Sequence, residues 1–498
     1  MTYTLRLSDG REIEATEEQV AIIDFARWGE ANLLVNALAG SAKTSTLRFL
    51  AKYMSLEPTL SLAFNKRIVD ELVKVLPGHV KPSTVNSIGH RAWGATIGKR
   101  LTLDTNKNGN ILKNFIESMG RREKSETWDI FSDIVKAVSL AKLSGYVPPQ
   151  SIQSKSLLEE AEFFAMLEEE PDNWFVDLVN RILTESIRQS FGGLIDFDDQ
   201  IYMSTLFGGQ FPSFPRITVD EAQDLSRINH AMLDKLVKPG TKVIAVGDPN
   251  QSIYAFRGAM TSSMQELKRR YNMHEMTLSV SFRCSINVVK KARARTPHMK
   301  WPAWAVEGKV ETLEKWNAKD IPDYSAIICR NNAPLLSCAL ALLRAGRGVK
   351  LIGTDLGPQL IKALKKFGDL SMPQEAVITA IDAWEAEKMR KSRNAASVAD
   401  KAECLRVFAY FGPTLGAAVA YAEHIFGASG PIQLMSGHKS KGLEFDVVYH
   451  LDPHRIPSPW SKEGEALEQE LNIRYVIETR PKRELYLVSM DGYETEEP

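Results

Sequence analysis

Residues 36 to 47, NALAGSAKTSTL, contain the residue types of a phosphate-binding loop but depart from its usual pattern. In the pattern G-x-x-x-x-G-K-[ST], backbone N–H groups and the lysine bind phosphates, and the final hydroxyl is a ligand of Mg²⁺. Lys43 and Thr44 match the last two positions, whereas Ala37 and Ala42 replace both motif glycines. An alanine costs little where the backbone is right-handed, but a positive φ at Ala42 would cost about 1 kcal/mol or more.

The flanking sequence supplies the elements that such a loop needs. NLLVNA before the loop predicts a buried strand, and TSTLRFLAKY after it predicts a helix. At a helix N-terminus, free N–H groups and the helix dipole attract phosphates. We therefore expect Lys43 to reach the β- and γ-phosphates and Thr44 to bind Mg²⁺. The loop residues expected to bind the nucleotide are Ala39, Gly40, Ser41, Ala42, Lys43, Thr44 and Ser45.

Two further strands end in polar residues that suit nucleotide cleavage. RITVDEAQD is a hydrophobic run that ends in the adjacent carboxylates Asp220 and Glu221. Because ligands of open parallel sheets bind at the carboxyl ends of the strands, we expect Asp220 to hold Mg²⁺ and Glu221 to deprotonate the attacking water. A solvated turn would also carry an acidic pair, but this pair directly follows a buried strand. AVGDPNQSIYAFRGA then places Gln251 in a polar turn after a third strand.

The segments VDEAQD and GDPNQSIYAFRGA resemble motifs of superfamily 1 DNA helicases of the UvrD/Rep/PcrA type. LAFNKRI and the compact insertion in the second half of the chain resemble the F-box DNA helicase branch and its phage relatives. The resemblance extends over nearly the whole chain, with the motifs in the expected order. The family often has alanine at the position of Ala37, whereas Ala42 is a departure. The resemblance implies ATP and Mg²⁺ as cofactors.

Further nucleotide contacts are implied by this resemblance. Gln19 in ATEEQVAII matches the family's adenine-reading glutamine, whose amide can pair with the N6 and N7 edge of adenine. Thr16-x-x-Gln19 is also a capping box for the following helix, which leaves a structural role open. Gln251 is similar to the family's γ-phosphate sensor, which links hydrolysis to the DNA site. Glu444 in HKSKGLEFDVV matches the family's ribose-contacting glutamate.

Two arginines resemble family residues that act on the γ-phosphate. In LSVSFRCS, Phe282 would stack on adenine, since it keeps the flat face of the usual tyrosine, and Arg283 would contact the γ-phosphate. In IRYVIETRPKREL, Arg480 matches the arginine finger that stabilises the transferring phosphoryl group. Pro481 replaces the usual alanine and should end the helix at Arg480, which either fixes or misplaces the finger. With Lys43 on one sheet and both arginines on the other, hydrolysis would drive relative motion of the domains.

Aromatic and polar residues near several strand ends match the family's DNA-binding motifs. Single-stranded DNA binds through stacking of bases on aromatic rings and through contacts to phosphates. The alternation of Tyr254, Phe256 and Arg257 after a catalytic strand favours a DNA contact over core packing for Phe256. Asn86 stands where the family usually has histidine. The expected nucleic-acid contacts are Phe64, Asn65, Thr84, Asn86, Ser87, Tyr254, Phe256, Arg257, His438 and Lys439.

Composition limits the class of protein. The 498 residues are 44% hydrophobic and 25% charged, which predicts packed cores rather than disorder. The formal net charge is zero, so any polyanion must be held by local basic clusters. The four cysteines lack C-x-x-C spacing and are expected to be buried thiols of a reducing compartment. No run approaches the roughly 18 apolar residues of a membrane span, so we expect a cytoplasmic location, or a nuclear one in a eukaryote.

Short β-branched runs alternate with longer helical patterns, which predicts an α/β fold with two separate parallel sheets. The expected strands are NLLVNA, TLSLAF, RITVDE and KVIAVGD in the first sheet, and SAIICR, VKLIG, DVVYHL and ELYLVSM in the second. The resemblance implies that each sheet belongs to a RecA-like P-loop NTPase domain, and that each of these domains carries a mainly helical insertion. The expected domains are 1–93 with 194–275 for the first sheet, 94–193 for its insertion, 276–355 with 430–498 for the second sheet, and 356–429 for its insertion.

The sequence therefore predicts a DNA-dependent ATPase that acts as a DNA helicase or translocase on single-stranded DNA. By resemblance it would move 3′ to 5′. We expect a monomer that meets duplex junctions and proteins of replication, repair or recombination. Two alternatives stay open. The small second insertion is compatible with a translocase that displaces DNA-bound proteins and unwinds little. Ala42 and Pro481 are compatible with a nucleotide-gated DNA-binding module without turnover.

Overall fold

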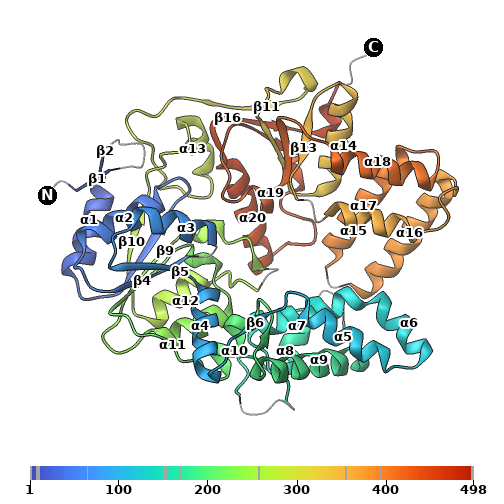
Figure 1. The fold of residues 1–498 in the computed structure, drawn as a ribbon. Coiled ribbons are helices and arrows are strands. Elements are labelled where there is room, and N and C mark those ends of the chain that lie inside the picture. The colour runs from blue at the N-terminus through green and yellow to red at the C-terminus, as the bar shows by residue number, and fades with distance from the viewer. Residues whose placement is uncertain are drawn as a thin grey trace. The chain divides into compact units, whose positions relative to one another are not determined.

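The structure is a computed structural model that describes residues 3–6, 12–63, 66–149, 154–167, 170–255, 258–353, 356–392 and 394–494 (Figure 1). Four of the expected DNA contacts, Phe64, Asn65, Phe256 and Arg257, lie outside these residues. The chain divides into two compact units. The first comprises Met1–Ala37 and Ala42–Leu278, and the second comprises Leu38–Ser41 and Ser279–Pro498.

The first unit is built on a parallel sheet that has six strands in the described part of the chain. In spatial order they are β10 (His274–Leu278), β3 (Leu33–Ala37), β9 (Lys242–Gly247), β8 (Arg216–Val219), β4 (Thr59–Ala63) and β5 (Val80–Thr84). The four strands expected from the sequence are confirmed, and they are the four interior strands. Both edge strands, β5 and β10, were not expected.

Helices cover both faces of this sheet, which explains why its interior strands are hydrophobic throughout. Leu33 and Val35 of β3 pack with the two helices on one face, and Leu34 between them packs with two helices on the other. The helices on the first face are α1 (Glu17–Trp28) and α2 (Lys43–Tyr53), and those on the second face include α11 (Arg227–Leu236) and α12 (Ser263–Arg270). Two further helices, α3 (Lys66–Val75) and α4 (Val85–Ile97), follow strands β4 and β5. The short strands β1 (Thr4–Arg6) and β2 (Glu12–Glu14) pair antiparallel.

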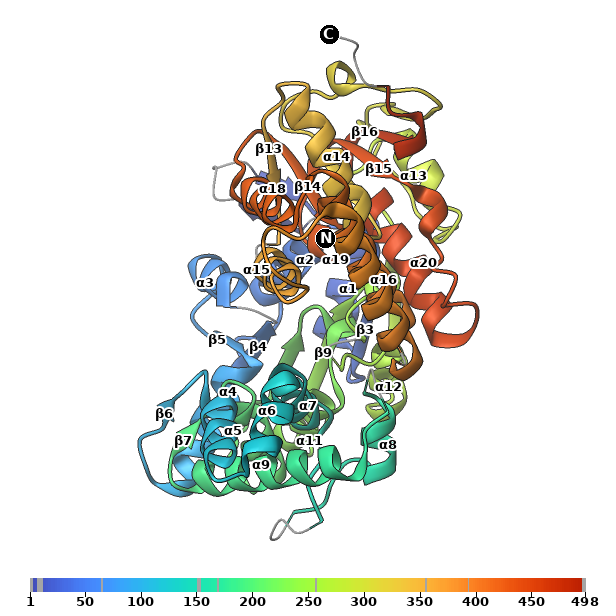
Figure 2. The same ribbon diagram turned by 90° about the vertical axis from the view of Figure 1, so that its right-hand side faces the viewer.

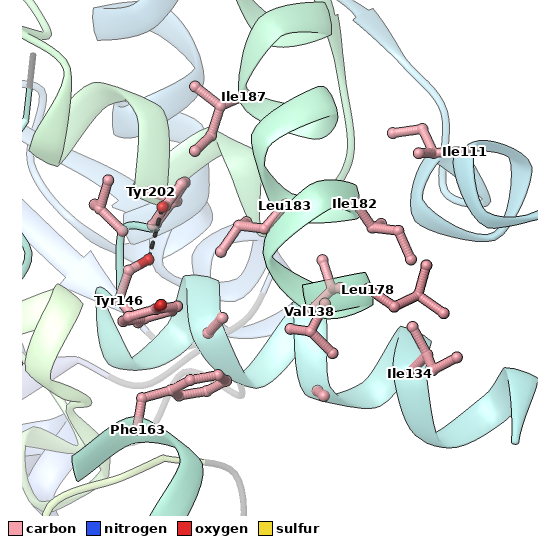
Figure 3. Packing of buried hydrophobic residues seen from close by; sticks show 14 of the residues in the cluster. Ile111, Ile134, Val138, Tyr146, Phe163, Leu178, Ile182, Leu183, Ile187 and Tyr202 are labelled. Carbon is pink, nitrogen blue, oxygen red and sulfur yellow. Dashed lines mark hydrogen bonds between the residues drawn. The ribbon is translucent and has the colours of Figure 1, made fainter. Parts of the chain in front are cut away.

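A mainly helical region follows α4. Its elements are β6 (Thr102–Leu103), α5 (Lys107–Glu117), α6 (Arg121–Asp129), α7 (Phe131–Ser144), α8 (Glu160–Ala165), α9 (Asn173–Phe191), β7 (Leu194–Ile195) and α10 (Asp199–Leu206). Ile134 and Val138 of α7 lie beside Leu178 of α9 in a shared hydrophobic core (Figure 3). The Tyr202 hydroxyl donates to the Tyr146 carbonyl oxygen at 2.7 Å, so this core also satisfies its polar groups.

Two fully buried lysines lie inside this helical region. Lys107 Nζ is 2.7 Å from Asp199 Oδ2, and Lys142 Nζ is 2.8 Å from Asp199 Oδ1 and 2.5 Å from Asp196 Oδ2. Burial opposes the ionisation of Asp199, but the adjacent Lys142 and Lys107 lower its pKa to about 2. Because a buried charge requires its partner, this cluster fixes how α5, α7 and the start of α10 meet.

The second unit also contains a parallel sheet with six strands in the residues that the structure describes. In spatial order they are β11 (Lys309–Leu313), β16 (Pro481–Val488), β15 (Phe445–Leu451), β12 (Ala326–Cys329), β14 (Ile432–Ser436) and β13 (Val349–Leu351). The four expected strands are again confirmed as β12, β13, β15 and β16. The edge strand β11 and the interior strand β14 were not expected. The prediction of two parallel α/β sheets is therefore confirmed.

Helices of the second unit form a cluster at one end of this sheet. Leu336 and Leu340 of α14 pack in the same core as the four helices of residues 356–427 (Figure 1 and Figure 2). The helices of this unit are α13 (Ile286–Ala292), α14 (Asn332–Arg344), α15 (Leu356–Leu364), α16 (Gln374–Lys391), α17 (Ala395–Tyr410), α18 (Leu415–Gly427), α19 (Gly437–Ser440) and α20 (Gly464–Glu478). The division of each unit into a sheet domain and an insertion stays a prediction.

Two expectations from composition concern the whole chain. Cys284, Cys329, Cys338 and Cys404 are all buried free thiols. Among the described residues, no helix has both the length and the apolar character that crossing a bilayer requires.

Asp198 lies beside the buried charge cluster and gives a testable dependence of stability on pH. Burial first, and then the charge of Asp196, raise the pKa of Asp198 to about 6 from its ordinary 3.8. The fold thus favours the protonated carboxyl, and this contribution to stability is lost as the pH rises through about 6. We expect Asp198→Asn to raise the free energy of unfolding at pH 7.5 by up to about 2 kcal/mol, and to change little below pH 4.

Thermal unfolding between pH 4 and 8 measures this effect. Asp177→Asn is the matched control, because Asp177 lies on a helix surface with its side chain 58% exposed. The account is contradicted if Asp198→Asn and the natural chain have the same pH profile of stability.

Candidate active site

The carboxyl ends of three neighbouring strands meet at one edge of the first sheet. Strand β9 is hydrogen-bonded to β3 on one side and to β8 on the other. Lys43 follows β3 after a short loop, Asp248 follows β9, and Asp220 and Glu221 follow β8. The strand order therefore brings a lysine and three carboxylates together at the edge where open parallel sheets bind ligands.

Lys43 is the first residue of α2 and forms an ion pair with Glu221. Its Nζ lies 3.2 Å from Glu221 Oε2, and the two side chains are 15% and 25% exposed. Burial opposes the charge on Lys43, but Glu221, Asp248 and Asp220 together raise its pKa above the ordinary value. Lys43 is therefore charged at neutral pH and stabilises the acidic residues around it.

Asp220 and Asp248 are buried carboxylates of this site. Burial, followed by the charge of Glu221, raises the pKa of Asp220 to about 7, and burial raises the pKa of Asp248. Three carboxylates thus act on the single positive charge of Lys43. A divalent cation would offset the excess negative charge and keep the carboxylates ionised, and oxygen ligands of this kind suit Mg²⁺. The Thr44 hydroxyl is exposed at the start of the same helix.

Two residues absent from the expected set connect these acidic groups. The Gln223 side-chain amide donates to Glu221 Oε2 at 2.6 Å, and its Oε1 accepts from the Asp248 N–H at 3.0 Å. The expected Gln251 donates to Asp248 Oδ2 at 2.7 Å. Gln223 and Asp248 thus join Glu221, the expected catalytic base, to Gln251, the expected γ-phosphate sensor. The signal for Asp248 in the sequence is its position, since it follows β9 as Asp220 follows β8.

The backbone is left-handed at two non-glycine residues of the site. Ala42 has φ 61° and ψ 42°, and Glu221 has φ 50° and ψ 43°. Ala42 thus carries the strain that a glycine would relieve, of about 1–2 kcal/mol. Ala37 ends strand β3 in an extended conformation, so its replacement of the first motif glycine costs nothing there. Strain at residues of this kind is common at functional sites.

The first half of the phosphate loop is grouped with the second unit and is held by it. The Ala39 N–H donates to the Tyr475 hydroxyl at 3.0 Å, and the Gly40 carbonyl accepts from the Phe282 N–H at 2.9 Å. Gly40 has φ 73°, and a Cβ there would lie 2.6 Å from Ser281 Oγ, so this position requires glycine. The Ala39 N–H is therefore not free to bind a phosphate unless Tyr475 releases it.

Gln19 has the structural role that the capping box predicts. Its Oε1 accepts from the Thr16 N–H at 3.0 Å, and the Thr16 hydroxyl accepts from the Gln19 N–H at 3.2 Å. The Gln19 amide also donates to Thr46 Oγ1 at 2.9 Å, and the side chain is buried. Adenine reading by Gln19 stays a prediction, and it would require these bonds to be exchanged.

Arg283 and Arg480 each have hydrogen-bond partners inside the second unit. Arg283 Nη2 lies 2.6 Å from Glu444 Oε1, and its Nη1 donates to the Thr479 carbonyl at 3.3 Å. Arg480 is 1% exposed, and its Nε donates to the Val476 carbonyl at 2.8 Å. Burial first, and then the charge of Arg283, lower the pKa of Arg480 to about 10, so the guanidinium stays protonated at neutral pH.

The end of α20 differs slightly from the expectation. The helix ends at Glu478, two residues before the expected end at Arg480, and Pro481 begins β16. The Arg480 N–H still donates to the Ile477 carbonyl at 3.1 Å, which tightens the last turn of the helix.

The expected residues that flank strands β14, β15 and β16 of the second unit lie at opposite ends of these strands. Glu444 and Arg480 immediately precede Phe445 and Pro481, which pair at the starts of β15 and β16. His438 and Lys439 instead follow the carboxyl end of β14. Because the strands are parallel, Glu444 and Arg480, which are predicted to bind nucleotide, lie at the amino ends of the strands. The two residues predicted to bind DNA lie at the carboxyl ends.

Three of the described DNA candidates of the first unit lie near the carboxyl end of the edge strand β5, whereas Tyr254 follows strand β9. The Thr84 hydroxyl accepts from the Ser87 N–H at 3.1 Å and caps α4. The Asn86 side-chain amide donates to the Phe197 carbonyl at 3.0 Å. Phe197 was not expected, yet this residue is 56% exposed and lies beside Asn86. Tyr254 is half-buried.

Fold and site together define a P-loop nucleoside-triphosphate-binding protein, because a lysine-bearing loop and acidic strand ends share one edge of a parallel sheet. The family described as UvrD/REP helicase N-terminal domain matches residues 16–272. The family described as UvrD-like helicase C-terminal domain matches residues 417–492. The chain belongs to the UvrD/Rep helicase family.

Curated relatives agree with this membership. F-box DNA helicase protein 1 of Schizosaccharomyces pombe is 22% identical over 523 residues, covering 95% of this chain and 57% of the relative. F-box DNA helicase 1 of Gallus gallus is 23% identical over 534 residues, covering 95% and 49%. ATP-dependent DNA helicase PcrA of Staphylococcus epidermidis is 24% identical over 325 residues, covering 60% and 44%. The chain thus spans about half the length of these relatives.

The two alanines at the motif-glycine positions give opposite predictions for stability. We expect Ala42→Gly to raise the free energy of unfolding by about 0.5–1 kcal/mol, because glycine removes the left-handed strain at some entropic cost. Ala37→Gly is the matched control, and we expect it to lower the free energy of unfolding by about 1 kcal/mol, because it loosens a buried strand. Urea unfolding of the two variants measures both effects. Destabilisation by Ala42→Gly equal to that by Ala37→Gly would contradict the backbone angles of Ala42.

Proposed function

We propose that the chain is an ATP-dependent DNA helicase or translocase that moves on single-stranded DNA. The observation that carries this proposal is the ion pair of Lys43 with Glu221, which lies among buried carboxylates at the edge of a parallel sheet. Membership of the UvrD/Rep helicase family supports a DNA-dependent ATPase. The relatives named F-box DNA helicase and ATP-dependent DNA helicase PcrA support DNA as the substrate.

Nucleotide binding exchanges the partners of Lys43. Its raised pKa means that Lys43 is charged when it leaves Glu221 and binds the β- and γ-phosphates of ATP. Glu221 then orients and deprotonates the attacking water, while Gln223 keeps its hydrogen bond of 2.6 Å to this carboxylate. Bound Mg²⁺ would neutralise charge on the phosphates, with Thr44 and Asp220 as its protein ligands.

Other residues complete the proposed chemistry. Arg283 and Arg480 stabilise negative charge on the transferring phosphoryl group. Gln251 senses the γ-phosphate through its hydrogen bond to Asp248, which also contacts Gln223. The remaining proposed nucleotide contacts are Gln19 at the adenine edge, Phe282 on the adenine face, Glu444 at the ribose, and Ala39, Gly40, Ser41, Ala42 and Ser45 around the phosphates.

Single-stranded DNA is the proposed track of the motor. Thr84, Asn86 and Ser87 at the start of α4 offer hydroxyl and amide groups to phosphates, and the exposed Phe197 next to Asn86 offers a stacking face. Tyr254 is a second stacking candidate. His438 and Lys439 in the second unit are proposed phosphate contacts. Duplex junctions and proteins of replication, repair or recombination are the proposed partners, in the cytoplasm or in a nucleus.

ATP turnover tests the proposal most simply. We expect single-stranded DNA to stimulate phosphate release, and Lys43→Ala and Glu221→Gln each to lower kcat by about a hundredfold or more, because one loses the phosphate-binding charge and the other the base. Lys235→Ala is the matched control, since Lys235 is an exposed lysine at the last turn of α11. Steady-state phosphate release with and without DNA measures all four proteins.

Other outcomes would favour the alternatives. Tight ATP binding without turnover in the natural chain would point to a nucleotide-gated DNA-binding module. The strained backbone at Ala42 is the observation that favours this alternative function. Turnover with removal of a protein block from DNA, but without strand separation on tailed duplexes, would point to a protein-displacing translocase. Unwinding of duplexes with a 5′ tail in preference to a 3′ tail would contradict the proposed polarity.

The exposed aromatic ring beside Asn86 gives a separate test of the DNA track. We expect Phe197→Ala to weaken binding of a single-stranded oligonucleotide by about 1–3 kcal/mol, because a stacked base contributes that much. Trp28→Ala is the matched control, since Trp28 is 68% exposed in the same unit and is not a proposed DNA contact. Fluorescence anisotropy of a labelled oligonucleotide measures both. Equal affinities for Phe197→Ala and Trp28→Ala would exclude Phe197 from the track.

A further inference from the structure

Trp304 stacks on Phe282 and is itself mostly open to solvent. The ring centroids are 6.3 Å apart with an angle of 30° between the planes. Trp304 is 69% exposed and Phe282 is half-buried, so the pair lies at the surface of the second unit. Trp304 therefore exposes most of its surface to solvent while it packs on Phe282.

The backbone holds Trp304 in place. Trp304 lies in a turn that the Ala305 N–H closes by donating to the Pro302 carbonyl at 2.9 Å. On the N-terminal side of this turn, the Lys300 carbonyl accepts from the Ser281 N–H at 2.8 Å. The residue next to Phe282 is thus tied to the segment that carries the tryptophan.

The chain is fixed on the other side of the turn as well. The Val306 carbonyl accepts from the Ile286 N–H at 2.9 Å, and the Glu307 carbonyl accepts from the Asn287 N–H at 2.9 Å. Both bonds join the turn to the start of α13. Because the turn is anchored before and after Trp304, the fold sets the position of its backbone beside the segment of Phe282.

Phe282 is in turn bonded to the phosphate loop. Its N–H donates to the Gly40 carbonyl at 2.9 Å, within the group of residues that belong to the second unit. A Cβ on Gly40 would lie 2.7 Å from Arg283 Cβ, so the loop passes directly against this segment. The aromatic pair of Trp304 and Phe282 is therefore connected to the loop that is proposed to hold phosphates.

We propose that Trp304 is a positioning residue for the nucleotide base: it covers one face of Phe282, so that the base stacks on the other face. The inference rests on the proposed nucleotide site and adds a residue to it. The separation of 6.3 Å lies within the range of a direct aromatic pair, about 4.5–7 Å, so the two rings leave no room for a base between them.

This arrangement predicts a specific kind of selectivity. Trp304 restricts the ring of Phe282 before the nucleotide arrives, so less freedom is lost when the base stacks on it. The resulting gain in binding affinity applies only to ligands that carry an aromatic base, and the affinity for a bare phosphate chain stays unchanged. Stacking depends weakly on base identity, so Trp304 favours the presence of a base rather than adenine in particular.

Calorimetric titration with a non-hydrolysable ATP analogue, AMP-PNP, and with inorganic tripolyphosphate tests the inference. For Trp304→Ala we expect the Kd of AMP-PNP to rise roughly two- to tenfold, with the Kd of tripolyphosphate unchanged. Trp304→Phe should restore most of the affinity. Trp460→Ala is the matched control, since Trp460 is 58% exposed in the same unit. In turnover, Trp304→Ala should raise KM for ATP and leave kcat unchanged.

Two results would overturn the inference. An unchanged Kd of AMP-PNP in Trp304→Ala would mean that the indole does not act on the base. Equal weakening of AMP-PNP and tripolyphosphate would mean that Trp304 only supports the local structure. In either case DNA-stimulated ATP turnover by the natural chain would leave the proposed function standing, whereas a natural chain that binds neither ligand would remove both.

Discussion

The charge of Lys43 among three carboxylates, of which Asp220 and Asp248 are buried, is the interaction on which the site depends. Glu221, Asp248 and Asp220 would repel one another at the sheet edge, and the lysine compensates this repulsion. The strand order places β9 between β3 and β8, which brings the lysine and the acids into one cluster. The backbone is left-handed at Glu221 and at Ala42, which directly precedes Lys43. Local backbone strain therefore lies next to both partners of the ion pair.

Several of the polar groups that the proposed function would use already have partners inside the protein. Lys43 is paired with Glu221, Arg283 with Glu444, and the Ala39 N–H with the Tyr475 hydroxyl. Such pairing avoids unsatisfied buried groups, which would be costly without a ligand. Under the proposed function, nucleotide binding would be an exchange of partners, and its net free energy would be the difference between two sets of contacts. A chain built in this way can be switched by modest changes in those contacts.

In the two six-stranded sheets of the described residues, hydrophobic patterning predicts seven of the eight interior strands, but it misses three of the four edge strands, β5, β10 and β11, and the interior β14. An edge strand has one unpaired side and carries polar or proline residues, as in VKPST and HEMTL, so its sequence lacks a continuous apolar run. Lys43, Asp220 and Glu221 could be predicted because each follows an interior strand. The φ of Ala42, the Gln223 bridge and the exposure of Phe197 depend on three-dimensional packing that no local pattern encodes.

A crystal structure of the chain with Mg²⁺ and AMP-PNP tests the central claim most directly. The account predicts that Lys43 Nζ leaves Glu221, from which it now lies 3.2 Å, and binds the β- and γ-phosphates. It also predicts that Thr44 and Asp220 bind the metal ion, and that Glu221 faces the γ-phosphate through a water molecule. A nucleotide bound elsewhere, or a nucleotide bound at the loop with the ion pair of Lys43 and Glu221 unbroken, would contradict it.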